Sequence, residues 1–95
     1  MILHGGLIAL RQEGLWRGVL IEGPSGAGKS DLALRALTLG FRLVADDRVQ
    51  VFASRGRLFG KAPAALSGLI EARGVGVLPE PSLALAEIVL AAWCA

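Results

Sequence analysis

Residues 23–30 read Gly-Pro-Ser-Gly-Ala-Gly-Lys-Ser and match the pattern Gly-x-x-x-x-Gly-Lys-Ser of a phosphate-binding loop at every position. Residues 17–22 before the loop are strand-like, and residues 31–37 after it have a helical pattern. The glycines let the backbone adopt positive φ angles and turn its N–H groups inward. The helix that follows adds the positive end of its dipole. This arrangement of strand, loop and helix therefore predicts a site for a polyphosphate.

Two side chains of this loop have expected roles. In such loops the lysine, here Lys29, reaches the terminal phosphates, and the hydroxyl that follows, here Ser30, binds Mg²⁺. The alternative is a glycine-rich turn that binds nothing. The complete motif and the correct flanks on both sides disfavour that alternative.

A second informative segment follows the loop. Asp46, 17 residues after Lys29, and Asp47 come directly after the apolar residues 43–45. In enzymes with such loops, an aspartate at a strand end commonly holds Mg²⁺ or orders its water shell. Adjacent side chains on a strand point to opposite faces, so both can serve one site only if the strand ends there. One carboxylate would serve the metal and the other would accept a proton from an attacking hydroxyl. An exposed Asp-Asp turn or helix cap is the alternative.

At this point the chain resembles a known family, the HPr kinase/phosphorylases. These bacterial enzymes phosphorylate a serine of the phosphocarrier protein HPr in the sugar phosphotransferase system. Four segments in order carry the resemblance: Leu-His-Gly-Gly at 3–6, the loop at 23–30, Leu-Val-Ala-Asp-Asp at 43–47, and Leu-Ile-Glu-Ala-Arg-Gly-Val-Gly at 69–76. The resemblance implies an α/β fold, a P-loop kinase core with a mixed sheet like that of the HPr kinases and the phosphoenolpyruvate carboxykinases. It also implies one such domain over residues 1–95, minimal or truncated at its C-terminus.

The resemblance also assigns site residues, position by position. The residues implied in catalysis are His4, Lys29, Asp46, Asp47 and Arg73. The residues implied in binding ATP are Gly23, Pro24, Ser25, Gly26, Ala27, Gly28, Lys29 and Ser30, and those implied in binding Mg²⁺ are Ser30 and Glu71. One of the two aspartates would be the base that deprotonates the acceptor serine, and Asp47 is preferred over Asp46. For His4 the alternative is a satisfied residue in an edge strand.

The implied function is an ATP-dependent serine kinase of the cytoplasm, with ATP and Mg²⁺ as cofactors and HPr or a nitrogen-branch homologue as acceptor. Family members form hexamers, so a homo-oligomer is expected. The family segment linked to the reverse, phosphorolytic reaction has no match here, and that reaction is expected to be weak. Two alternatives remain: a nucleotide-binding regulatory module without turnover, and a small-molecule P-loop kinase. Retention of Lys29, both aspartates and Glu71 favours catalysis.

Composition sets further limits. The 95 residues are 54% hydrophobic and include thirteen glycines, which suits one small, turn-rich α/β domain. A net charge of +2 with scattered basic residues argues against nucleic acid. The basic residues of positions 42–61 are either a solvated hairpin face or a docking surface for an acidic partner. Residues 83–93 are apolar but too short to span a bilayer. The single cysteine, Cys94, fits a reducing compartment, and the N-terminus lacks a signal-peptide pattern.

The remaining pattern predicts the other elements. Strands are expected at residues 3–10 and 16–21, with a turn at residues 11–14 between them. A helix of about ten residues is expected after the loop, with Leu32, Ala36 and Leu39 on one face beside Ala33 and Leu37, and with Gly40 at its end. A hairpin is expected from strands 48–53 and 57–59. Residues 83–93 form a buried strand or a packing helix. A hairpin so soon after the aspartates predicts a mixed sheet rather than a regular alternation of strands and helices.

Overall fold

The computed structural model describes all residues, 1–95. Its elements are β1 (Ile2–Gln12), β2 (Leu15–Glu22), α1 (Lys29–Leu37), β3 (Arg42–Ala45), β4 (Arg48–Ser54), β5 (Arg57–Lys61), the 3₁₀ turn η1 (Ala64–Leu66), β6 (Leu69–Ala72), β7 (Gly76–Pro79) and β8 (Ala86–Trp93). Strand β8 runs parallel to β2, whereas the other strand pairs are antiparallel. The expected mixed sheet is therefore confirmed. The only α-helix is not long enough to cross a membrane.

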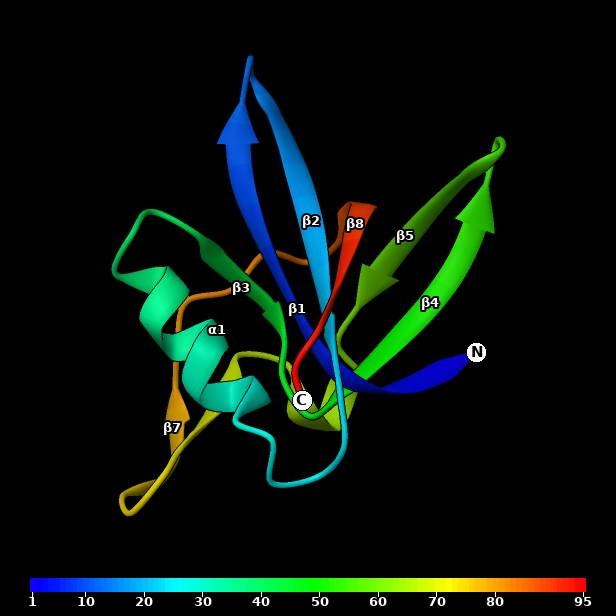
Figure 1. Ribbon diagram of the computed structural model, residues 1–95. Coiled ribbons are helices and arrows are strands. Elements are labelled where there is room, and N and C mark those ends of the chain that lie inside the picture. The colour runs from blue at the N-terminus through cyan, green and yellow to red at the C-terminus, as the bar shows by residue number, and fades with distance from the viewer.

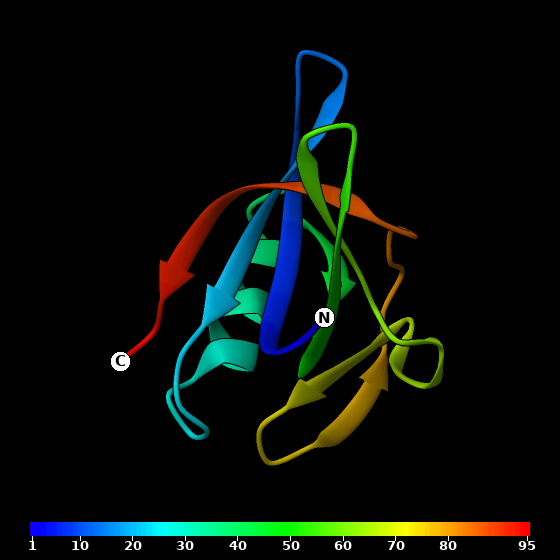
Figure 2. The same cartoon turned by 90° about the vertical axis from the view of Figure 1, so that its right-hand side faces the viewer.

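The main sheet closes on itself because β1 is long enough to have different neighbours along its length. Its first residues pair with β4, its remainder pairs with β2, and β3 pairs with its middle on the other edge. Strands β4, β5, β8 and β2 are hydrogen-bonded in that order and complete the circuit. In Figures 1 and 2 the two long hairpins, β1–β2 and β4–β5, project from this closed body. A closed sheet has fewer free strand edges, which suits a chain of this size.

Both long hairpins turn at two residues of positive φ. These are Glu13 and Gly14 between β1 and β2, at 52° and 80°, and Arg55 and Gly56 between β4 and β5, at 51° and 76°. Two consecutive positive φ angles are the signature of the type I′ turn, which matches the twist of the strands that it joins. The turns that the sequence predicted at these two places are confirmed.

Side-chain alternation along β1 divides the core in two. Leu7 and Ala9 point into the closed sheet, where they pack with side chains of β4 such as Val49 and Val51. Ile8, between them, points to the other face and packs against α1 and its neighbours. This second cluster holds α1 against the sheet, and thereby sets where the helix begins.

The buried face of α1 matches the expected one in part. Ala33 is fully buried, and Ala36 and Leu37 pack around the same cluster, as expected. The expectation was wrong for Leu32 and Leu39, which are 43% and 76% exposed. Leu39 also lies beyond the last helical residue, Leu37, so helical periodicity no longer applies to it.

Gly40 ends the helical segment as expected. Its φ is 99°, its N–H donates to the Leu37 oxygen at 3.4 Å, and the Phe41 N–H donates to the Ala36 oxygen at 3.3 Å. This pair of hydrogen bonds defines a Schellman motif with glycine at the C′ position.

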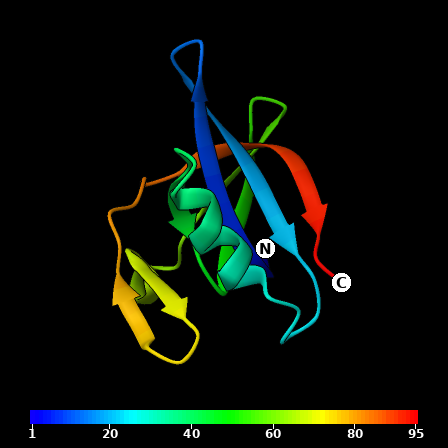
Figure 3. The same ribbon diagram turned by 60° about the vertical axis from the view of Figure 1, so that its left-hand side comes forward.

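The two segments after β5 differ in position: one lies beside the helix and the other joins the main sheet. Strands β6 and β7 form a separate two-stranded sheet beside α1, which Figure 3 shows below the helix. Ile70 of β6 is buried in the cluster under α1 and anchors this hairpin. Residues 83–93 contain a strand, β8, rather than a helix, and the strand is not buried, because half of its residues are exposed and only Ala86 is buried.

Candidate active site

The loop between β2 and α1 presents free backbone donors. Gly26 and Gly28 have φ angles of 82° and 92°, and a Cβ at either would meet no atom within 4 Å, so glycine is required there by conformation and not by space. The N–H groups of residues 25, 26 and 28 donate to no backbone carbonyl. The first N–H groups of α1 also lack partners, as at every helix start. These donors and the helix dipole fit a polyphosphate.

Cys94, the residue after strand β8, makes hydrogen bonds to the phosphate-binding loop and to the end of β2. The Cys94 N–H donates to the Glu22 oxygen at 2.7 Å, and the Cys94 thiol donates to the Ala27 oxygen at 3.0 Å. A Cβ at Gly23 would collide with the Cys94 carbonyl oxygen, so this glycine is required by close approach. No local motif marks Cys94, because its role depends on the parallel pairing of β8 with β2.

Lys29 lies along its own loop. Its Nζ atom donates to the carbonyl oxygens of Gly23 at 2.7 Å and Pro24 at 2.9 Å. An ammonium group has three donors on a flexible stem, so rotation of the side chain can transfer these bonds to a phosphate. The position fits the role expected for this lysine.

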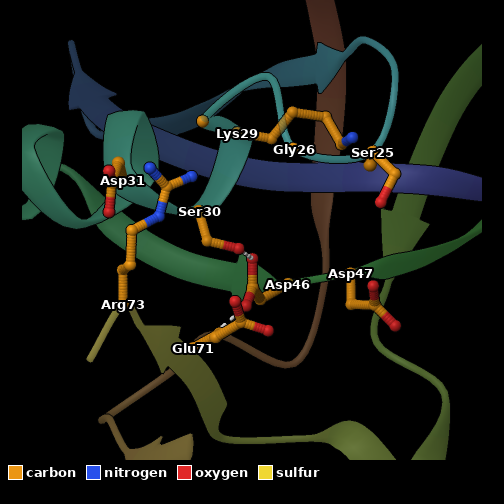
Figure 4. Close-up of a pocket in the computed structure, with 11 residues that line it drawn as sticks. Ser25, Gly26, Lys29, Ser30, Asp31, Asp46, Asp47, Glu71 and Arg73 are labelled. Carbon is orange, nitrogen blue, oxygen red and sulfur yellow. Dashed lines mark hydrogen bonds between the residues drawn. The ribbon is translucent and has the colours of Figure 1, made fainter. Parts of the chain in front are cut away.

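Asp46 connects the start of α1 with β6. It is 5% exposed, and its Oδ1 accepts a hydrogen bond from the Ser30 hydroxyl at 2.8 Å while its Oδ2 accepts one from the Glu71 N–H at 2.9 Å. Figure 4 shows the carboxylate between these two residues. The two donors offset the cost of burying the charge. Asp46 therefore places Ser30 and Glu71 on one side of the pocket.

Asp47 is oriented differently although it is the next residue. Strand β3 has already ended, and the Arg48 N–H donates to the Asp46 oxygen at 2.8 Å across Asp47, whose φ is 69°. This is a γ-turn, a strained conformation of the kind that is found at functional sites. The turn points the Asp47 side chain away from the group formed by Ser30, Asp46 and Glu71 (Figure 4), and this side chain is 69% exposed. Its nearest cation is Arg48, at 4.0 Å, in a weak surface contact.

Replacing Asp46 by alanine is expected to lower the free energy of unfolding by about 1–3 kcal/mol, because two donors lose a charged acceptor. Denaturant titration followed by the fluorescence of the two tryptophans measures this change. The matched control is Asp47→Asn, which keeps a residue that tolerates positive φ and should change stability by less than about 0.5 kcal/mol. Equal losses in both variants would contradict the role of Asp46.

One pocket collects most of the expected site residues. Its lining residues are Gly5, Ser25, Gly26, Gly28, Lys29, Ser30, Asp31, Asp46, Asp47, Glu71 and Arg73, none of which is hydrophobic. Arg73 comes from the β6–β7 turn and reaches toward Asp31 on α1 (Figure 4). The fold thus brings the loop, the two aspartates and the 69–76 segment, which are distant in sequence, to one pocket.

Four expected residues do not line this pocket: His4, Gly23, Pro24 and Ala27. Gly23, Pro24 and Ala27 serve as carbonyl partners or close-contact positions within the loop. His4 is exposed on β1 opposite Arg48, one residue away from a lining glycine.

Two lining residues were not expected, Gly5 and Asp31. A Cβ at Gly5 would collide with the Ile21 oxygen, so glycine is required there. The Gly-Gly pair of the 3–6 segment was the feature of the sequence that could have indicated this residue. An acidic residue in the first turn of a helix, as at Asp31, is common for dipole reasons alone and gave no separate signal.

Comparison with known proteins agrees with this geometry. The family described as HPr Serine kinase C-terminal domain matches residues 1–83. This chain belongs to that family. The resemblance seen in the sequence is therefore confirmed.

Several HPr kinase/phosphorylases are similar in sequence. The protein of Clostridium tetani is 48% identical over 66 residues, which cover 70% of this chain and 22% of that protein. The protein of Limosilactobacillus reuteri is 46% identical over 82 residues, covering 85% and 24%. The chain thus spans about a quarter of the length of these relatives. Among solved structures, the Hpr(Ser) kinase/phosphatase of Coxiella burnetii matches with a TM-score of 0.84 and 26% identity, covering 98% of this chain and 58% of that one.

The polar pocket fits Mg²⁺ held in part by a nucleotide. No group of three or more His, Cys, Asp or Glu side chains forms an all-protein cage. Magnesium commonly takes one or two protein ligands and completes its octahedron with phosphate oxygens and water. The Ser30 hydroxyl and the Glu71 carboxylate lie in the same pocket, with Asp46 bonded to both residues. These oxygen donors are therefore of the kind that Mg²⁺ binds.

Proposed function

We propose that this chain is an ATP-dependent serine kinase whose acceptor is HPr or a nitrogen-branch homologue. The observation that carries the proposal is a polar pocket lined both by loop residues whose N–H groups have no backbone partner and by one buried and one exposed aspartate. Phosphoryl transfer to a hydroxyl requires a site that positions the polyphosphate and a carboxylate that is available to accept the hydroxyl proton. The relatives carry the name HPr kinase/phosphorylase, which supports the choice of acceptor.

Residues 23–30 hold the ATP phosphates in this proposal. The N–H groups of the loop and of the start of α1 bind the phosphate oxygens, and Lys29 exchanges its two loop carbonyls for the terminal phosphates. Ser30 and Glu71 are the magnesium ligands, and Asp46 holds the Ser30 hydroxyl and the backbone N–H of Glu71. Bound magnesium supplies charge neutralisation for the phosphoryl group that is transferred.

Asp47 is the proposed base. Both oxygens of Asp46 already accept hydrogen bonds, whereas Asp47 is exposed at the pocket and accepts none through its side chain. The acceptor serine oxygen forms a bond to the terminal phosphorus as the bond from that phosphorus to the bridging oxygen breaks. ADP leaves, and the hydroxyl proton passes to Asp47. Arg73 adds positive charge at the same pocket, and His4 is proposed to act from its rim.

Phosphoserine formation tests the function directly. The chain is incubated with Mg-ATP and HPr, and the carrier is examined by mass spectrometry for a phosphate on serine. The proposal expects ATP-dependent phosphoserine. ATP binding with no phosphoserine on any carrier would instead support a regulatory module without turnover, and transfer only to small hydroxyl compounds would support a small-molecule kinase.

We further propose that residues 1–95 act as one domain, in the cytoplasm where ATP and the carrier occur, and that the chain forms a homo-oligomer. Val89 and Trp93, four residues apart on β8 and 46% and 72% exposed, support self-association, because exposed large apolar side chains on one face of a strand commonly mark an interface. Sedimentation that gives only a monomer at high concentration would contradict the oligomer.

A further inference from the structure

A second, largely apolar pocket adjoins the phosphate pocket. Its lining residues are Asp46, Asp47, Leu66, Leu69, Ile70, Glu71 and Val77. The three carboxylates belong to both pockets, whereas the phosphate pocket has no hydrophobic lining residue. Asp47 therefore lies on the boundary between a polar space and an apolar one.

The β6–β7 hairpin builds the apolar side. Glu71 and Val77 are directly opposite each other in the register, and Leu69 lies two residues before Glu71, so all three share one face of the hairpin. Leu69 is half-buried and Val77 is 63% exposed. The proposed magnesium ligand thus stands between two aliphatic side chains on the same rigid element. Leu66, from η1, covers the pocket from the other side.

The direction of transfer makes this pocket relevant to the acceptor. In phosphoryl transfer the attacking and leaving oxygens lie roughly in line, with the phosphorus between them. The loop and Lys29 occupy the nucleotide side, so the acceptor hydroxyl comes to Asp47 from the opposite side, where the apolar pocket opens. In an extended segment the next residue is about 3.3–3.6 Å further along the chain. A side chain next to the acceptor serine is then within reach of Leu69 and Val77.

We propose that this apolar pocket is the acceptor subsite and takes an aliphatic side chain directly flanking the acceptor serine. The proposal rests on the proposed kinase function and adds the sequence preference of the acceptor. Aliphatic atoms are favoured because their burial against Leu66, Leu69 and Val77 removes apolar surface from water. An acidic residue at the same place is disfavoured because Asp46, Asp47 and Glu71 would repel it.

Matched peptides and variants test this preference. Three serine peptides differ only in the residue after serine, which is valine, threonine or aspartate. Valine and threonine have the same shape, so the comparison isolates the apolar contact. The expected kcat/KM is about 5- to 10-fold higher for the valine peptide than for the threonine peptide, and lowest for the aspartate peptide.

Val77→Thr should lower kcat/KM for the valine peptide by about 5- to 10-fold through KM, with kcat and ATP affinity kept. The matched control is Val75→Thr, because Val75 is 72% exposed in the hairpin turn and lines none of the pockets described above. This control should behave as the wild type. Unequal behaviour of the two variants cannot result from a general loss of folding, since both side chains are exposed.

Methyl NMR of the wild-type chain provides a readout that does not depend on turnover. The valine peptide should shift the methyl signals of Leu66, Leu69 and Val77. Phosphorylation of all three peptides at equal kcat/KM, without these shifts, overturns the subsite and leaves the kinase function intact. Specific shifts with no phosphorylation of any peptide or of HPr uphold the subsite and overturn the kinase function. The absence of methyl shifts together with the absence of phosphorylation of the peptides and of HPr overturns both. If these methyl signals shift with protein concentration and do not respond to the peptide, a second copy of the chain occupies the pocket and the subsite is overturned.

Discussion

Asp47→Asn is expected to slow phosphoryl transfer to HPr by about 10²–10⁴-fold, the range typical of a lost general base. Asparagine keeps the size of the side chain and tolerates the positive φ of 69°, so the γ-turn should persist. ATP affinity should stay close to that of the wild type, because the loop donors and Ser30 are untouched. Steady-state kinetics with the carrier and calorimetry with Mg-ATP measure the two quantities separately.

Two further variants sharpen this result. Glu13→Gln removes a carboxylate from the β1–β2 turn, far from the pocket, and should leave the rate unchanged. Asp46→Asn should disturb the Ser30 and Glu71 contacts and hence nucleotide binding as well as rate. A rate loss confined to Asp46→Asn would transfer the role of base from Asp47 to Asp46.

Lys29→Ala is expected to weaken Mg-ATP binding by about 1–3 kcal/mol, or about 5- to 150-fold in Kd, the scale of a lost hydrogen bond to a charged group. The backbone cradle remains, since its glycine conformations do not depend on the lysine. Calorimetric titration measures the change. Lys61→Ala is the matched control, because it removes the other lysine of the chain, on β5. Unchanged ATP affinity in the Lys29 variant would be incompatible with the assigned loop.

Local sequence patterns predicted much of this site because the determinants are themselves local. The loop motif, the two-residue turns and the glycine after α1 each depend on neighbouring residues or on a required φ angle. The expectation that four separate segments meet at one site came from the family resemblance. That resemblance placed Glu71 and Arg73 near the loop, and both residues line the pocket.

Features that depend on tertiary packing were not predictable in the same way. The buried side of α1 is set by Ile8 and Ile70 beneath it, and helical spacing alone could not choose Ala33 over Leu32. The contact of Cys94 with the loop requires the parallel β2–β8 pairing. The different directions of Asp46 and Asp47 depend on a γ-turn that no residue type specifies.

The most direct test of the kinase account is the stoichiometry of transfer in a single turnover. ATP labelled in its terminal phosphate is supplied in amounts below the enzyme, with HPr in excess, and labelled phosphoserine and free phosphate are both counted. The account predicts about one phosphoserine on the carrier for each ATP consumed, and a rate that falls with Asp47→Asn. ATP that is consumed with only free phosphate released, or transfer that is unaffected by Asp47→Asn and Asp46→Asn alike, would contradict it.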